Sequence, residues 1–146
     1  MFSEFIKAHK SYFTFQKIYS NIKCNYYSWN DQQYAQFMMS ILSCLEPRRE
    51  EREKILFNEL DDFTEVIFFH KGKVKVGFHI NHRQFFVLIK KNGVVLADHG
   101  CTFNQKATFI YKTHTLCEGF YIRKVNWHKI INEPNEITDQ LKTKMV

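Results

Sequence analysis

The sequence is poor in the residues that mark several large classes of protein. Its 146 residues include only five Gly and two Pro, against fifteen Phe, which argues against a disordered or low-complexity chain. No apolar run reaches the roughly 18–20 residues that a membrane-spanning helix needs. No run of Lys and Arg exceeds two residues, so the net charge of +6 forms no dense basic block for nucleic acid. These absences favour one packed domain with no membrane span of its own and no nucleic-acid partner.

The cysteines form no metal or disulfide pattern. They stand at positions 24, 44, 101 and 117, with no Cys-x-x-Cys pair and no His at ligand spacing. We therefore expect no bound metal and reduced thiols in a reducing, intracellular compartment. His99 and Cys101 have no orienting acid except Asp98, so we expect no catalytic residue and no enzyme. The first 23 residues hold four Lys and no Arg, so we expect them to be retained, with a mitochondrial location left open.

Helical spacing predicts helices at both ends of the chain. Residues 2–20 form an amphipathic helix whose apolar stripe either packs in the core or docks on a partner. Asn30 or Asp31 caps a second helix, which Pro47 ends. Asn126 caps a short helix up to residue 131, and a further helix covers residues 137–145. The candidate partner-docking residues on the first stripe are Phe2, Phe5, Ile6, Tyr12 and Phe13.

From Ile55 the apolar period changes to two, which indicates β-strands. Lys71-Gly72 predicts a β-hairpin between the runs on either side, and Asn92-Gly93 is a second hairpin signal. Residues 48–54 alternate in charge sign, which predicts an exposed turn or short helix. The predicted strands are residues 55–57, 65–70, 73–78, 84–90, 94–96, 108–112, 114–117 and 119–123.

This pattern predicts an α+β protein built on an antiparallel, eight-stranded, jelly-roll-like β-roll with helices on either side. We expect an N-terminal helical segment at residues 1–47, which serves for docking or as a linker. The β-roll follows at residues 48–124, and C-terminal helices occupy residues 125–146. An irregular connector at residues 97–106 interrupts the roll.

Six motifs between about residues 40 and 133 occur in an order that resembles a known family. They are Leu45-Glu46-Pro47-Arg48, the run from Ile55 to Asp61, Lys71-Gly72 with Val-x-Val-Gly-Phe after it, the run from Cys101 to Asn104, the run from Phe109 to Thr113, and Cys117-Glu118-Gly119 through to Asn126-Trp127. Together they resemble the cyclic-nucleotide-binding domain of the voltage- and ligand-gated potassium channels of ciliates. The resemblance implies a β-roll with a phosphate-binding cassette, preceded by a helical linker that joins the pore and assembles four subunits.

The resemblance places the cassette at residues 97–106. Such cassettes present Gly-Glu, then a short helix whose N–H groups face the cyclic phosphate, then Pro-Arg. Here the first pair reads Ala97-Asp98, and the second reads Asn104-Gln105 or Gln105-Lys106, depending on a gap. A shorter acid, an uncharged amide and a Lys without a bidentate fork each weaken the site. The ligand-binding residues of this vestigial cassette are Ala97, Asp98, Gly100, Cys101, Thr102, Gln105, Lys106 and Ala107.

We therefore expect a cyclic-nucleotide-binding-like domain without ligand or cofactor, acting as a non-catalytic scaffold or accessory subunit among protein partners in a larger complex. The alternative is a regulatory domain or potassium-channel subunit that senses cAMP or cGMP and associates with a membrane channel. The resemblance favours the cytoplasm, a cilium or the cytoplasmic face of a membrane.

Overall fold

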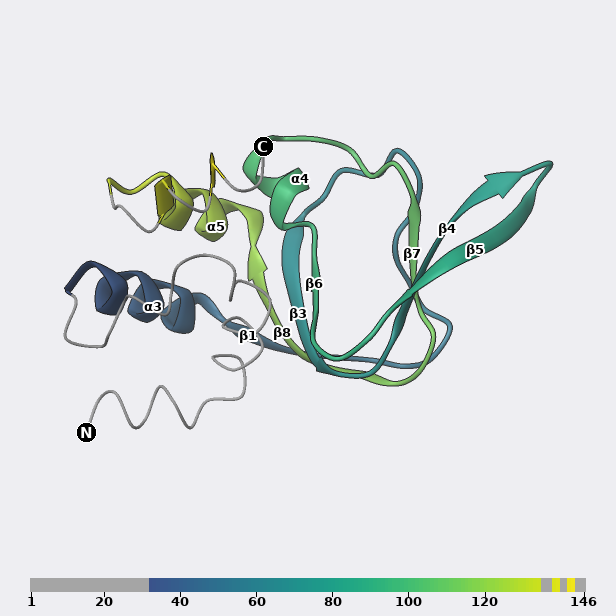
Figure 1. Cartoon of the computed structure of the whole chain (residues 1–146), viewed down its shortest axis with the longest axis horizontal. Helices are drawn as coiled ribbons and strands as arrows, with labels where there is room; N and C mark the ends of the chain where they lie inside the picture. Colours follow the sequence, from purple (N-terminus) through teal and green to yellow (C-terminus); the bar gives the residue numbers. More distant parts are fainter. Residues whose placement is uncertain (1–31, 135–137, 140–141, 144–146) are drawn as a thin grey trace.

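The protein is a β-roll with helices gathered at one end (Figure 1). The structure, a computed structural model, describes residues 32–134, 138–139 and 142–143. The predicted docking residues Phe2 to Phe13 and most of the predicted helix at 137–145 lie outside these ranges. None of the helices in the described ranges is long and apolar enough to cross a membrane.

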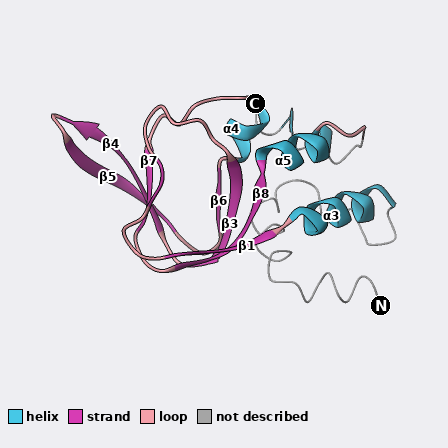
Figure 2. Ribbon diagram, turned by 180° about the vertical axis from the view of Figure 1, so that it is seen from behind, coloured by secondary structure: helices cyan, strands magenta, loops and turns pink. Residues whose placement is uncertain are grey.

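Two four-stranded antiparallel sheets form the roll, with strand orders β1-β8-β3-β6 and β2-β7-β4-β5. Seen from behind, the helices lie on one side of the roll and the β4–β5 hairpin projects from the other (Figure 2). The predicted eight-stranded α+β roll is confirmed. The strands are β1 Glu46–Glu50, β2 Ile55–Phe57, β3 Glu65–Lys71, β4 Val74–Ile80, β5 Arg83–Lys90, β6 Val94–Leu96, β7 Ile110–Thr113 and β8 Cys117–Arg123. The helices are α3 Gln32–Cys44, α4 Asp98–Thr102 and α5 Lys124–Ile131.

The core lies between the sheets and continues under the helices. Helix α3 follows the predicted pattern and buries Phe37, Met38 and Ile41. Its neighbours are α5 and β8, so the apolar stripe of α3 closes the helical end of the roll. The largest side chains with almost no exposed surface are Trp127, Phe68, Phe69, Met38, Ile67, Leu96, Ile110, Ile122 and Ile131.

Strand β1 corrects the first part of the prediction of an exposed turn or short helix at residues 48–54, whereas Arg52 and Glu53 form an exposed turn as predicted. It pairs with β8 alone, so it is an edge strand, where a proline such as Pro47 is tolerated. Alternate side chains of β1 are half-buried, and Arg48 forms ion pairs with Glu50 and Glu65. What alternates along β1 is therefore burial, with Glu46, Arg48 and Glu50 half-buried and Pro47 and Arg49 exposed.

The predicted strand at residues 114–117 is wrong, because most of that segment forms the turn between β7 and β8. His114 N–H and Thr115 N–H both donate to Lys73 O, at 2.8 and 3.4 Å, rather than to a neighbouring strand. Thr113 ends β7 by donating its hydroxyl to Glu51 O at 2.6 Å while accepting from Lys54 N–H at 2.8 Å.

The predicted hairpin at Lys71-Gly72 is also wrong, although the chain does turn there. Gly72 has a φ of +106°, but β3 and β4 enter different sheets, so the turn is a corner between the two sheets. Asn92-Gly93 likewise links β5 of one sheet to β6 of the other. Among the strands of the described residues, consecutive ones pair only in β4–β5, which turn at Asn81 and His82 with φ values of 51° and 63°, as a two-residue type I′ hairpin requires.

Helix α5 begins earlier than predicted. It starts at Lys124, with Arg123 rather than Asn126 as its N-cap and with no side-chain cap. Lys124 N–H donates to Thr64 O at 3.0 Å, so a contact from the segment before β3 sets the start of the helix.

Candidate ligand-binding site

The connector between β6 and β7 contains the short helix α4. Cys101 N–H donates to Ala97 O at 2.8 Å, and Phe103 N–H donates to His99 O at 3.0 Å. Gln105 N–H then donates to Gly100 O at 2.9 Å, which closes the end of the helix. The five residues of α4 therefore fit within the short connector that the sequence indicated.

A cavity of about 270 Å³ opens beside the first turn of α4. This volume is slightly below the roughly 300–1,000 Å³ of most small-molecule pockets. The first turn of an α-helix has N–H groups without partners in the helix, and residues of this turn line the cavity. Five of the predicted cassette residues line it, namely Ala97, Asp98, Gly100, Gln105 and Lys106.

Three predicted cassette residues lie elsewhere, in the packing around α4. Cys101 is fully buried, and burial raises the pKa of its thiol to about 12. Ala107 is also buried, and its N–H donates to Asp61 O at 2.8 Å. Thr102 accepts a hydrogen bond from Trp127 Nε1 at 2.9 Å. None of these three residues lines the cavity, so they contribute to the packing that supports α4 rather than to its ligand-facing surface.

Gly100 lies where a larger side chain would meet the core. A Cβ at this position would lie 2.0 Å from Cδ2 of Phe63, whose ring packs directly against α4. Phe63 in turn packs edge-on against Phe57, with ring centroids 4.8 Å apart. Helix α4 is thus seated on the aromatic core of the roll.

The sequence did not identify the residues that complete the cavity wall. Lys90 comes from the end of β5 and Tyr111 from β7, two strands of the sheet opposite β6. Burial raises the pKa of Tyr111. Neither residue has a local sequence signal, because only the pairing of the strands brings them beside α4. The other lining residues that we had not predicted are Phe63, Val95, Leu96, His99, Thr108 and Phe109.

The charges at the cavity are weak ligands for a cyclic phosphate. Among the described lining residues there is no Arg, and the cations are Lys90 and Lys106. Lys106 Nζ lies 3.9 Å from Asp62 Oδ1, with both side chains mostly exposed. Such an exposed pair is weak, so an acid lies near the Lys106 ammonium without holding it. No cluster of three or more metal-ligating side chains is present in the described part of the chain.

Ala97 adopts a backbone conformation better suited to glycine. It precedes α4 with φ 70° and ψ 8°, in the left-handed region. We expect Ala97→Gly to raise the free energy of unfolding by about 0.5–1 kcal/mol in urea denaturation. The left-handed conformation costs about 1–2 kcal/mol in a residue with a Cβ, so Gly removes this cost from the folded state. The greater conformational entropy of Gly in the unfolded chain takes back about 0.5–1 kcal/mol of this stabilisation. Ala107, which is buried and has no positive φ, is the matched control, and Ala107→Gly should lower stability. A loss of stability in both variants would contradict the strain at Ala97.

Helix α5 is bonded directly to α4. Besides the bond from Trp127 to Thr102, His128 Nε2 donates to Cys101 O. Trp127 has no exposed surface. The closing helix and the cassette helix therefore form one packed unit at the helical end of the roll.

Comparisons with known proteins identify the fold. No family model matches the chain, and no curated protein matches it. Among solved structures, the regulatory domain of Toxoplasma gondii PKA with cAMP matches with TM-score 0.59 and 12% identity, over 65% of this chain and 36% of that one. A protein of Ruegeria pomeroyi assigned as a cyclic-nucleotide-binding protein matches with TM-score 0.63 and 17% identity, over 75% and 49%. The cAMP-binding acyltransferase of Mycobacterium smegmatis, as a mutant, matches with TM-score 0.57 and 14% identity, over 75% and 34%.

The fold is therefore that of a cyclic-nucleotide-binding domain, as the sequence motifs suggested. At these identities, the likeness establishes the fold alone. The matched region spans about a third to a half of the length of these three structures.

Proposed function

We propose that this protein is a cyclic-nucleotide-binding-like domain that no longer binds a nucleotide and acts as a non-catalytic scaffold or accessory subunit of a larger assembly. One observation carries the proposal: the cavity beside α4 has no guanidinium among its described lining residues. An Arg fork binds a phosphate through two parallel hydrogen bonds, whereas the ammonium of Lys acts as a point charge.

The second candidate function is a domain that senses cAMP or cGMP, as a regulatory domain or channel subunit. It is favoured by Lys90 and Lys106, which supply positive charge to a cavity that also contains the first turn of α4. Asp98 lines the same cavity and offers a carboxylate in the place where such sites use Glu to hold the ribose hydroxyl. This function requires the ammonium groups of Lys90 and Lys106 together to bind the cyclic phosphate that an Arg guanidinium binds in such sites.

Isothermal titration with cAMP and with cGMP separates the two candidates. We expect no heat of binding from the unmodified chain at millimolar nucleotide, because the phosphate lacks a bidentate partner. The double variant Asp98→Glu/Lys106→Arg is the matched gain-of-function test, since it restores the Glu and the guanidinium of such cassettes, and we expect it to bind nucleotide more tightly than the unmodified chain. Micromolar binding by the unmodified chain would exclude the scaffold proposal in its present form.

A further inference from the structure

The β4–β5 hairpin carries an apolar strand edge that the proposed function does not use. Strand β5 is the last strand of its sheet, and no described strand pairs with its outer edge. Both ribbon views show the hairpin projecting away from the helices (Figures 1 and 2). A long apolar edge is a template for pairing with another chain, and soluble proteins usually blunt or cover such edges.

The middle of β5 is apolar and exposed. It reads Phe-Phe-Val-Leu-Ile, and the exposed fractions of Phe85, Val87, Leu88 and Ile89 are 45%, 68%, 52% and 48%. Ile80, which ends β4, adds another apolar side chain at 48%. Leu88 lies opposite Val76 and Ile89 opposite Lys75, so the exposed apolar side chains are divided between the two faces of the hairpin, and Val87 is the extra residue of a β-bulge. Single exposed apolar residues are ordinary, but this many on one short strand mark an interaction surface.

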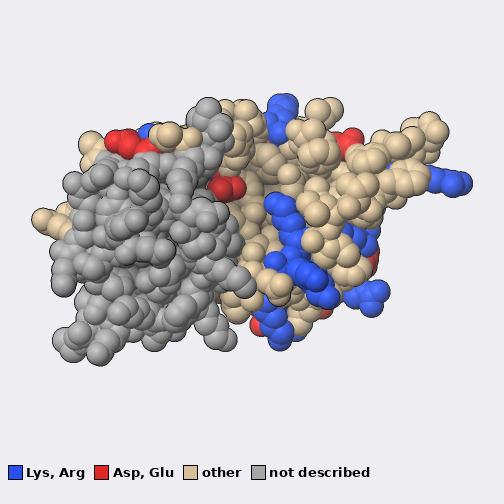
Figure 3. All heavy atoms as spheres, viewed as in Figure 1, with Lys and Arg blue, Asp and Glu red and all other residues tan. Residues whose placement is uncertain are grey.

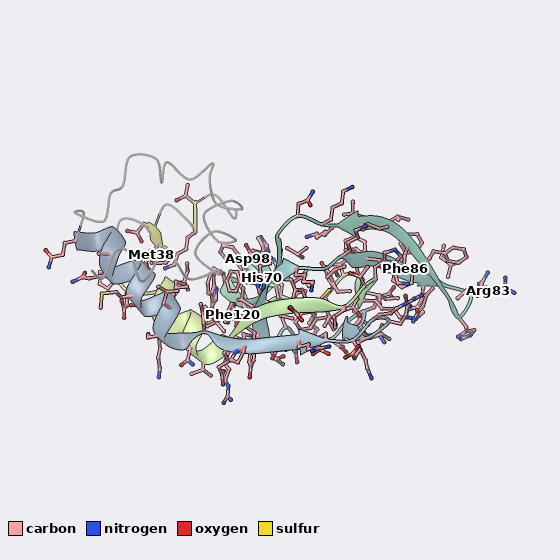
Figure 4. All side chains as sticks on the ribbon, turned by 90° about the horizontal axis from the view of Figure 1, so that it is seen from below. Met38, His70, Arg83, Phe86, Asp98 and Phe120 are labelled. Carbon is pink, nitrogen blue, oxygen red and sulfur yellow. The ribbon has the colours of Figure 1, made fainter. Side chains whose placement is uncertain are left out.

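Both ends of this edge are basic. Arg83 begins β5 at the tip of the hairpin, beyond Phe86 (Figure 4). Lys90 ends the strand, and Lys91 follows it. None of these three cations forms an ion pair with a described residue, although Lys90 also lines the cavity beside α4, so the charges of Arg83 and Lys91 are the ones available to a partner.

The basic character continues around the base of the hairpin. A hollow of about 420 Å³ lies beside Lys91, and Lys71 and Lys73 also line it. Figure 3 shows Lys and Arg side chains gathered over the half of the visible face that carries the roll and the hairpin, with few acidic ones among them. The lysines on the other side of β5 are already paired, since Lys75 and Lys112 both contact Glu53.

This charge pattern argues against a second copy of the chain as the occupant. An antiparallel pair of two β5 strands, centred on the strand, would place Arg83 of one copy opposite Lys90 of the other at both ends. Like charges directly opposite each other destabilise a strand pair. The edge is instead complementary to a strand with acidic ends.

We propose that the outer edge of β5 binds an extended segment of a partner protein, with an apolar middle and acidic ends, as an added β-strand. Main-chain hydrogen bonds along the edge supply affinity, and side chains of the segment contact the exposed apolar side chains of β5 on both faces of the hairpin. The acidic ends pair with Arg83 and with the lysines around Lys91. The inference rests on the proposed scaffold function and supplies its attachment surface.

Fluorescence anisotropy of the full chain with labelled synthetic peptides tests this inference. The probe has a middle as long as β5, eight residues of alternating Val and Thr, with Asp residues added at both ends. We expect saturable binding, weakened about ten-fold or more when Lys replaces Asp in the peptide, because the ends then meet like charges. We expect a similar loss for Val87→Glu and none for Val125→Glu, a control on α5 with nearly the same exposed fraction, 67% against 68%.

Several outcomes would overturn the inference. One is equal binding of the Asp-ended and Lys-ended peptides, and another is equal binding by the two Glu variants at unchanged thermal midpoint. Sedimentation that shows a dimer, lost in Val87→Glu, would assign the edge to a second copy instead. The nucleotide titration tests the proposed function separately. Binding of a nucleotide would refute the proposal that the domain has lost its ligand, but it would not affect the peptide result. A failed peptide assay would refute the β5 attachment surface, but it would not affect the proposal that the domain has lost its ligand.

Discussion

Replacing Trp127 with Ala should lower the free energy of unfolding by about 3–5 kcal/mol, the usual cost of truncating a buried aromatic residue. The side chain has no exposed surface and packs where α5 meets α4. Its removal leaves a cavity and takes away the hydrogen bond that Trp127 Nε1 donates to Thr102 Oγ1 at 2.9 Å. Urea denaturation followed by circular dichroism measures the loss.

Two control variants separate the contributions of Trp127. Trp127→Phe keeps most of the volume and loses the hydrogen bond, so we expect a smaller loss, with about 1 kcal/mol from the bond itself. Val125→Ala changes an exposed side chain on the same helix and should stay within about 0.5 kcal/mol of the unmodified chain. If Trp127→Ala were no more destabilising than Val125→Ala, α5 would not be packed on the roll as described.

Gly119→Ala should destabilise the protein by about 1–3 kcal/mol or more, the range for adding volume to a filled core. Gly119 lies in β8, between β1 and β3, opposite Arg48 on one side and Phe69 on the other. A Cβ at this position would lie 1.9 Å from Phe68 O, which is a main-chain atom of the neighbouring strand. The methyl group can be accommodated only if the two central strands of the sheet move apart.

The thermal midpoint of Gly119→Ala, compared with that of Glu118→Ala, checks this expectation. Glu118 is the preceding residue on the same strand, and its ion pair with Lys71 is a loose one, at 4.0 Å, between partly exposed groups. Such pairs contribute little to stability, so Glu118→Ala should leave the midpoint almost unchanged. Equal midpoints for the two variants would show that the central strands have room for a side chain at Gly119.

The turn signals in the sequence predicted correctly where the chain reverses, but not which strands pair across the turn. Lys71-Gly72 and Asn92-Gly93 do reverse the chain, but each joins strands of different sheets. A positive φ at Gly72 or Gly93 describes the local bend alone. Whether the next strand pairs with the previous one depends on where the apolar sides of both strands are buried, which is a property of the whole roll.

The residues of the candidate site also fall into a group that the sequence predicted and a group that it did not. Ala97, Asp98, Gly100, Gln105 and Lys106 were predicted because the family resemblance places a phosphate-binding cassette on this one connector, and they do line the cavity. Lys90 and Tyr111 could not be predicted, since they reach the cavity from strands of the opposite sheet. The prediction also included Cys101, Thr102 and Ala107, since the number of residues in a loop does not show which side chains turn inward.

Local chemistry in the sequence was enough to predict an antiparallel roll with helices before and after it in the chain, seven of its eight strands (β2 to β8), helix α3, and the lack of a guanidinium in the connector. Periodicity and side-chain type are properties of neighbouring residues, so they can be found in the chain itself. Only the tertiary structure decided that Glu46–Glu50 is an edge strand, that the turns are corners, and that β5 has an exposed apolar edge. These features depend on contacts between residues far apart in sequence, such as Arg48 with Glu65 and Lys124 with Thr64, which no local pattern contains.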